Sequence, residues 1–212
     1  MTILSNIQHK TEHEDKNRSL KHLMRVQIMK ERETFDEYEY QYANNKIYQN
    51  TLEIINSICP ELLRNADTEF SKNNLGLYWP LKGEPDLLKF VIIANNRTSL
   101  PKTLERQMVF IKYNCGDHVT QGLVSSIYQP TSTSEVHPCI IIVPGLAFTV
   151  NGYRLGFGKG YYDKYLDRIR STDNAAITIG VCFHKWLIEN IPCGIFDRQL
   201  NYVVTDQYII KI

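Results

Sequence analysis

Apolar residues recur at helical spacing in the first third of the chain, which predicts two helices there. The first is expected over residues 19–32, where four apolar residues form a stripe: Leu20, Leu23, Met24 and Ile28. The second is expected to begin near Phe35, because Thr34 and Glu37 have the spacing of a capping box. Pro60 follows the last apolar positions of this pattern, so the second helix is expected to end just before it.

Short apolar runs further along predict strands at 75–79, 108–111, 139–143, 176–183 and 202–204. The run 139–143 has no polar alternation, which is typical of a strand buried on both faces of a parallel sheet. Further helices are expected after Glu84-Pro85 and from about Gly160. Strands therefore alternate with helices, and we expect an α/β fold: an open, mainly parallel sheet flanked by helices, of the three-layer, doubly wound type.

Composition favours a single globular domain, since the 212 residues are 43% hydrophobic and 22% charged. Residues 1–18 are polar and of mixed charge, so we expect a flexible N-terminal tail followed by one α/β domain over 19–212. The 24 basic and 23 acidic side chains nearly cancel, which argues against nucleic acid or a membrane as the main partner. We expect a monomer, with a dimer as the alternative.

The location of the protein is expected to be cytoplasmic. The N-terminus has no secretory apolar region, and no apolar run is long enough to form a membrane-spanning helix. The five cysteines are scattered and odd in number, which indicates reduced thiols rather than a disulfide framework.

Glycines concentrate in one stretch, with five of the 11 between positions 145 and 160. Residues 154–163 read Arg-Leu-Gly-Phe-Gly-Lys-Gly-Tyr-Tyr-Asp and join the most buried predicted strand to a helix. Ligands of open α/β sheets bind at such crevices, and glycine amides before a helix attract phosphate oxygens. Residues 154–170 also hold five cations against two acids, which suits a nucleotide triphosphate.

The alternative is a glycine loop that only turns the chain and carries solvated charges. The spacing differs from both the Walker motif and the dinucleotide-binding fingerprint, which disfavours a standard P-loop kinase or dehydrogenase.

The glycine-rich stretch around residues 154–163 resembles the sequences of the 5-formyltetrahydrofolate cyclo-ligase family. The likeness is strongest over 143–148, 151–163 and 165–166, and weaker likeness extends it to roughly 19–206. The weaker positions are 21–25, 78–80, 84–86, 191–192, Asp197 and 203–205. The resemblance implies an enzyme that uses ATP and Mg²⁺ to convert 5-formyltetrahydrofolate into 5,10-methenyltetrahydrofolate, with release of ADP and phosphate.

The resemblance also implies roles for individual residues. The implied catalytic residues are Lys159, Arg154 and Tyr161. The implied ATP site comprises Lys21, Arg25, Arg154, Gly156, Phe157, Gly158, Lys159, Gly160, Tyr161 and Tyr162. The implied folate contacts are Trp79, Glu84, Phe157 and Tyr161, and the implied Mg²⁺ ligands are Asp163 and Asp197.

Without the resemblance, these residues have plainer readings. Lys21 and Arg25 would be solvated helix cations, and Trp79 and Tyr162 would belong to the core. Asp163 would be a first-turn acid favoured by the helix dipole, and Asp197 a turn residue.

Two residues depart from the family pattern. Thr149 stands where many members have Asp, and Trp186 replaces a frequent Gln. These departures leave room for altered folate affinity. The alternative functions are a non-catalytic folate- or nucleotide-binding paralogue, and a nucleotide-using ligase or kinase that acts on another small substrate.

Overall fold

The computed structural model describes residues 2–63, 74–95, 97–105, 107–123, 127–170, 175–194 and 197–212. The helices are α1 (Thr2–Glu33), α2 (Glu37–Ile58), α3 (Phe90–Ile93) and α4 (Tyr161–Arg170), with short 3₁₀ helices at Pro60–Leu62 and His184–Trp186. The first strands are β1 (Leu75–Gly76), β2 (Thr98–Leu104), β3 (Gln107–Tyr113), β4 (Val119–Gln121), β5 (Tyr128–Pro130) and β6 (Glu135–Val136). The others are β7 (Ile140–Val143), β8 (Ala147–Phe148), β9 (Arg154–Leu155), β10 (Ile177–Val181), β11 (Tyr202–Val204) and β12 (Ile209–Lys211).

The central sheet has eight strands in the order β12-β11-β10-β7-β1-β2-β3-β6. Its five middle strands, from β11 to β2, are parallel, and the antiparallel strands lie at its two ends. Strands β4 and β5 form a separate antiparallel pair, and so do β8 and β9. The expected open, mainly parallel sheet is therefore confirmed, although β2, β6 and β12 were not predicted.

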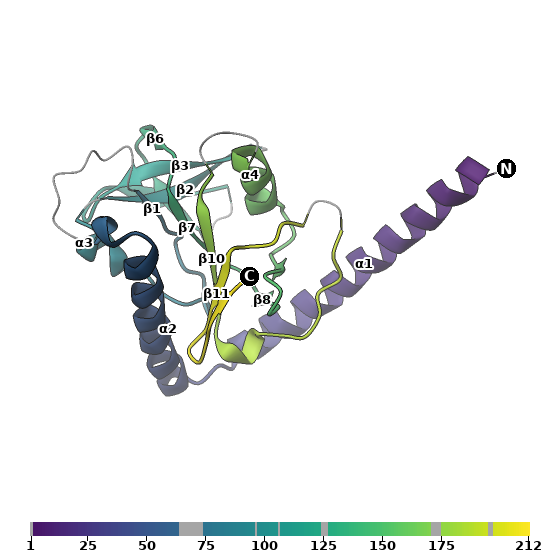
Figure 1. Cartoon of the computed structure of the whole chain (residues 1–212), viewed down its shortest axis with the longest axis horizontal. Helices are drawn as coiled ribbons and strands as arrows, with labels where there is room; N and C mark the ends of the chain where they lie inside the picture. Colours follow the sequence, from purple (N-terminus) through teal and green to yellow (C-terminus); the bar gives the residue numbers. More distant parts are fainter. Residues whose placement is uncertain are drawn as a thin grey trace.

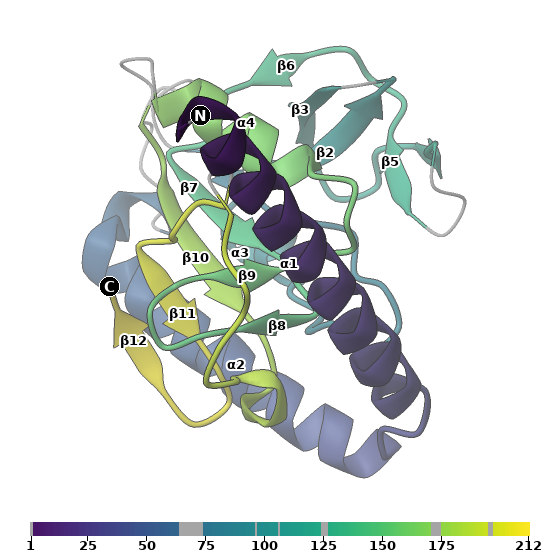
Figure 2. The ribbon, with the colours of Figure 1, turned by 90° about the vertical axis from the view of Figure 1, so that its right-hand side faces the viewer.

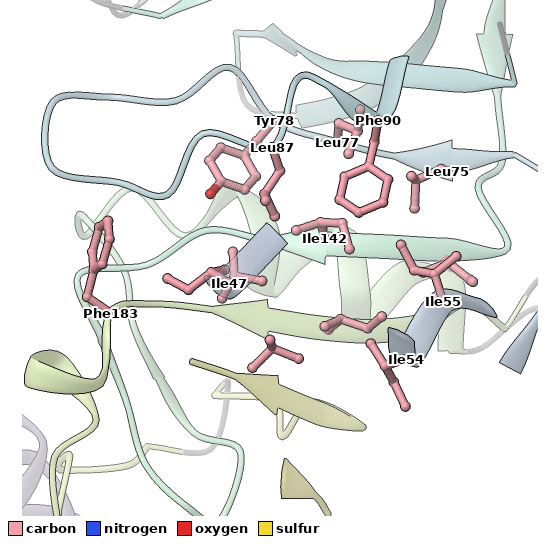
Figure 3. Packing of buried hydrophobic residues seen from close by; sticks show 14 of the residues in the cluster. Ile47, Ile54, Ile55, Leu75, Leu77, Tyr78, Leu87, Phe90, Ile142 and Phe183 are labelled. Carbon is pink, nitrogen blue, oxygen red and sulfur yellow. The ribbon is translucent and has the colours of Figure 1, made fainter. Parts of the chain in front are cut away.

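Strand β7 lies inside the sheet and contributes side chains to both faces, as its unbroken apolar run predicts. Ile140 and Ile142 belong to the core that contains α2 residues such as Ile47 and Ile55 (Figure 3). Ile141 and Val143 belong to the core beneath α4. Successive residues of a strand point to opposite faces, so the sheet is the middle of three layers.

Helix α1 is longer than the predicted 19–32, because its backbone is helical from Thr2 onward. Its N-terminal half projects away from the sheet (Figure 1), and its C-terminal half crosses the molecule near β8 and β9 (Figure 2). Of the predicted stripe, Ile28 is buried and Met24 packs against the core, while Leu20 and Leu23 are 41% and 64% exposed. The expected flexibility of residues 1–18 stays a prediction. Among the described residues, no helix offers an apolar span that a bilayer would accept.

Two local predictions are wrong. The predicted capping box does not form, because Asp36 is the N-cap of α2 and accepts a hydrogen bond from the Glu39 amide at 2.9 Å. The Thr34 hydroxyl instead donates to the Glu31 carbonyl. The helix expected after Glu84-Pro85 begins later and is shorter than predicted: residues 84–89 are not helical, and only α3 forms. The turns are held by buried contacts of Glu84 itself.

Candidate functional site

A cavity of about 920 Å³ lies where the chain leaves the carboxyl ends of β1 and β7. Its walls come from one face of α1, residues 78–84, residues 144–146, the glycine turn 156–160 and the start of α4. Segments far apart in sequence therefore share one cleft, at the edge where open α/β sheets place their ligands. The cavity includes every site residue that the sequence predicts: Lys21, Arg25, Trp79, Glu84, Arg154, residues 156–163 and Asp197.

The turn before α4 needs glycine for conformational reasons. Gly158 has a φ of 96° and Gly160 a φ of 69°, values that residues with a side chain rarely adopt. A Cβ on Gly158 would lie 3.4 Å from Arg25 Cζ, so α1 approaches this turn closely. Phe157 and Lys159 are exposed on the turn and line the cavity. The predicted glycine turn is thus positioned to accept an anionic ligand at the N-terminus of a helix.

Two cations of α1 reach the glycine turn and its surroundings. Arg25 Nε donates to the Gly156 carbonyl at 2.8 Å, and Lys21 Nζ lies 2.6 Å from Asp197 Oδ2. Burial lowers the pKa of Arg25, while the nearby Asp197 carboxylate opposes this shift. The i, i+4 spacing places both cations on one face of the helix, as predicted.

Arg154 is held by three contacts at the base of the turn. Its Nη2 lies 2.9 Å from Asp163 Oδ1, and its Nη1 donates to the Pro144 carbonyl at 3.3 Å. Its guanidinium lies over the ring of Tyr162, 5.4 Å from the ring centroid. This arrangement fixes a cation between the loop that follows β7 and the first turn of α4.

The two predicted metal ligands both line the cavity, but each is already paired with a cation. Asp163 contacts Arg154, and Asp197 contacts Lys21 and accepts a hydrogen bond from the Gly194 amide at 2.6 Å. Within the described ranges, no three His, Cys, Asp or Glu side chains gather closely enough to hold a metal. These carboxylates fit Mg²⁺ only as an ion that arrives with phosphate oxygens and keeps some of its waters.

The segment after β1 supplies an aromatic and a carboxylate to the same cavity. Trp79 is half-buried and packs against Tyr128, with ring centroids 5.3 Å apart. Glu84 is only 2% exposed, and its Oε2 accepts a hydrogen bond from the Leu81 amide at 2.9 Å. Burial raises the pKa of Glu84 to about 7, against the Leu81 hydrogen bond and the positive charges of Arg32 and Arg154.

Tyr161 and Tyr162 begin α4 and face different surroundings. The Tyr161 hydroxyl donates to the Glu105 carbonyl at 3.4 Å, which links α4 to the turn between β2 and β3. The Tyr162 hydroxyl is buried without a partner among the described residues, and burial raises its pKa. Tyr162 therefore lines the cavity and also packs against the core under α4.

Arg32 is the functional candidate that the sequence reasoning missed. It is 4% exposed, lines the cavity, and follows Lys21 by 11 residues and Arg25 by seven. These intervals are three turns and two turns of a helix, so the spacing alone places all three cations on one face. Arg32 lies in the charged run 30–33, whose side chains would ordinarily be solvated, so the sequence pattern did not single it out.

The two departures from the family pattern lie behind the cavity. Trp186 is buried beneath Arg32, whose guanidinium carbon is 4.6 Å from the ring centroid. Thr149 is buried in the β8–β9 turn, where its hydroxyl accepts a hydrogen bond from the Tyr153 amide at 3.2 Å. Neither residue lines the cavity, but Trp186 supports a side chain that does.

Comparison with known proteins places this arrangement in one family. The family model described as the 5-formyltetrahydrofolate cyclo-ligase family matches residues 17–206. The 5-formyltetrahydrofolate cyclo-ligase of Mycoplasma pneumoniae is 26% identical over 193 residues, which are 88% of this chain and 99% of that protein. A relative from Schizosaccharomyces pombe is 36% identical over 80 residues, but these are 34% of this chain and only 39% of that protein.

A solved structure supports the same relationship. The 5,10-methenyltetrahydrofolate synthetase of Aquifex aeolicus superposes with a TM-score of 0.72 at 26% identity, covering 91% of this chain and 92% of that one. The sequence resemblance is thereby confirmed over nearly the whole length, and the chain belongs to the 5-formyltetrahydrofolate cyclo-ligase family.

Proposed function

We propose that this protein catalyses the ATP-dependent cyclisation of 5-formyltetrahydrofolate to 5,10-methenyltetrahydrofolate. Family membership makes this the expected reaction. The observation that carries the proposal is that one cavity joins a cationic glycine turn to a half-buried tryptophan and a buried carboxylate. One part suits a triphosphate, and the other suits a flat heterocycle with N–H donors.

The proposed reaction has two steps. The formyl oxygen attacks the γ-phosphorus of ATP, and ADP leaves. N10 of the folate then attacks the activated formyl carbon, phosphate departs with its oxygen, and the N10 proton is lost. An amide oxygen is a poor leaving group, whereas phosphate is a good one, so the first step makes the ring closure feasible.

The residues of the glycine turn are assigned to the phosphoryl transfer. Lys159 is exposed at the cavity, free to approach the γ-phosphate and neutralise the charge that develops there. Lys21, Arg25 and Arg154 would bind the other phosphate oxygens. Tyr161 and Phe157 would close the cleft over both substrates.

Mg²⁺ would enter with ATP and offset the negative charge of the phosphates. Asp163 and Asp197 are the carboxylates that would hold it. Their present ion pairs support this assignment, since Arg154 and Lys21 could transfer their contacts from carboxylate to phosphate as the ion binds.

Trp79 and Glu84 are assigned to the folate. The Trp79 ring would stack on the pterin or aminobenzoyl ring, and Glu84 would accept hydrogen bonds from pterin N–H groups.

The five cysteines are free thiols, which supports the proposed cytoplasmic location.

The test is turnover by the purified protein. Mixed with MgATP and 5-formyltetrahydrofolate, it should produce the near-UV absorbance of the methenyl product, with one ADP formed per product. Folate binding without product would indicate a non-catalytic paralogue. ADP formed only with a different acceptor would indicate another nucleotide-using enzyme. Either outcome would contradict the proposal.

A further inference from the structure

Arg32 is a buried cation to which the proposed reaction gives no role. Its Nη2 donates to the carbonyls of Gly145 at 2.8 Å and Leu146 at 3.0 Å. Its Nε and Nη1 are buried without a partner among the described residues. A guanidinium has five N–H donors, so three of them have no acceptor among the described residues. Burying charged donors without acceptors is costly, which indicates that something else satisfies them.

An unused acceptor belongs to the same cavity. Glu84 Oε1 is buried without a partner among the described residues, while Oε2 is held by the Leu81 amide. The turn that carries Glu84 packs directly on Arg32, since a Cβ on Gly83 would lie 2.9 Å from Arg32 Cβ. Burial lowers the pKa of Arg32 and the charge of Glu84 opposes this shift, so the two groups lie within electrostatic range. No ion pair joins their side chains in the described part of the chain.

The two side chains are held rigidly enough to select a ligand. The Arg32 guanidinium is stacked on Trp186 and tied to two carbonyls, and Glu84 is tied to its own turn. Fixed donors beside a fixed acceptor match the edge of a ring that carries a carbonyl next to N–H groups. Such an edge exists on the pterin of folates, with a carbonyl at position 4, an N–H at position 3 and an amino group at position 2.

We propose that Arg32 determines substrate specificity by donating to the pterin 4-carbonyl, while Glu84 accepts from the neighbouring N–H groups. This inference rests on the proposed function. A ring with an amino group at position 4 would present donors to the donors of Arg32 and leave them unsatisfied. Arg32 thus selects 4-oxo over 4-amino pteridines.

The test compares folate with 4-amino-4-deoxyfolate, in which an amino group replaces the 4-carbonyl and N3 carries no proton. Their dissociation constants are measured by calorimetry with the wild-type protein and with Arg32→Met. The wild type should bind folate more tightly than 4-amino-4-deoxyfolate. In Arg32→Met this preference for folate should fall about tenfold or more, because a charged hydrogen bond is lost. Lys30→Met is the matched control, since it removes an exposed cation of the same helix that does not line the cavity, and it should keep the wild-type ratio.

Two outcomes would overturn the inference. Equal affinity of the wild type for both ligands would do so without any variant, and so would a ratio that stays within twofold in Arg32→Met. Thermal unfolding checks that the variant folds. If Arg32→Met does not fold, Arg32→Lys carries the test, because it keeps the charge and the apolar stem but loses the fork of donors. Turnover of 5-formyltetrahydrofolate by the wild type is measured separately, so its failure would count against the proposed function alone.

Discussion

Lys21 Nζ lies 2.6 Å from Asp197 Oδ2, which joins the long N-terminal helix to a loop 176 positions later in the chain. The side chains of the pair are 16% and 20% exposed. An ion pair in this setting is screened less than one on an open surface. It also places the α1 cations beside the glycine turn, so one contact serves both the fold and the candidate site.

Breaking this pair should reveal coupling between its members. Lys21→Met, Asp197→Asn and the double variant are compared by urea unfolding. Each single change should lower the free energy of unfolding, and the double variant should lose less than the sum by about 1 kcal/mol. Strictly additive losses would show that the contact contributes nothing to stability.

Lys159→Ala should reduce turnover much more than stability. Because Lys159 is exposed, its loss should change the free energy of unfolding by no more than about 0.5 kcal/mol. Losing a charge that neutralises the transferring phosphate should reduce kcat about 100-fold or more. Lys164→Ala, an exposed cation on α4 outside the cavity, should leave kcat unchanged. Parallel losses of activity and stability in Lys159→Ala would make the loop merely structural.

Gly158→Ala separates backbone strain from ligand binding. Gly158 and Gly116 have similar φ values, 96° and 91°, so each alanine variant should destabilise the protein by about 1 kcal/mol or more. Only the Gly158 variant places a Cβ beside Arg25, and only it should weaken ATP binding, by about tenfold or more. Calorimetric titration with ATP measures the difference. Unchanged ATP affinity in Gly158→Ala would place the nucleotide elsewhere.

Glu84 should make stability depend on pH. Burial raises its pKa to about 7 in the folded protein, against 4.5 as the ordinary value. In this window the folded state binds the proton more tightly than the unfolded state, so this contribution to stability is present below pH 4.5 and is lost as the pH rises to about 7. The upper bound on the loss is about 3 kcal/mol.

Urea unfolding at several pH values checks this dependence. The difference in unfolding free energy between the wild type and Glu84→Gln should fall from pH 4.5 to 7 and stay constant above that. Glu53→Gln, an exposed position on α2, should show no such trend relative to the wild type. A flat difference for Glu84→Gln would mean that its carboxyl is not held in a protonated form.

Strong local signals made part of the fold predictable from the sequence. The unbroken run at β7 indicated a strand buried on both faces, and the glycine string indicated a turn leading into α4. The structure has both segments where the sequence predicted them. The sheet order was not readable, because pairing between distant strands depends on tertiary contacts rather than on local pattern.

The errors occurred where tertiary contacts overrode local preference. The segment after Glu84 had a helical apolar spacing, but the Tyr40 hydroxyl donates to the Glu84 carbonyl and the Leu81 amide binds its carboxylate, which fixes turns instead. The start of α1 was missed because its polar residues show no apolar stripe. In the site, Arg32 was missed because its importance depends on burial, which a sequence pattern of charges does not reveal.

The central claim is that the phosphates of a nucleotide bind at the turn 156–160, in the cavity that also accepts a folate. A crystal structure of the protein with ADP, Mg²⁺ and 5-formyltetrahydrofolate tests it most directly. The β-phosphate is predicted to contact backbone amides of that turn and the cations of α1, with the pterin near Trp79 and Glu84. A nucleotide bound outside this cavity, with the turn left unoccupied, would contradict the account.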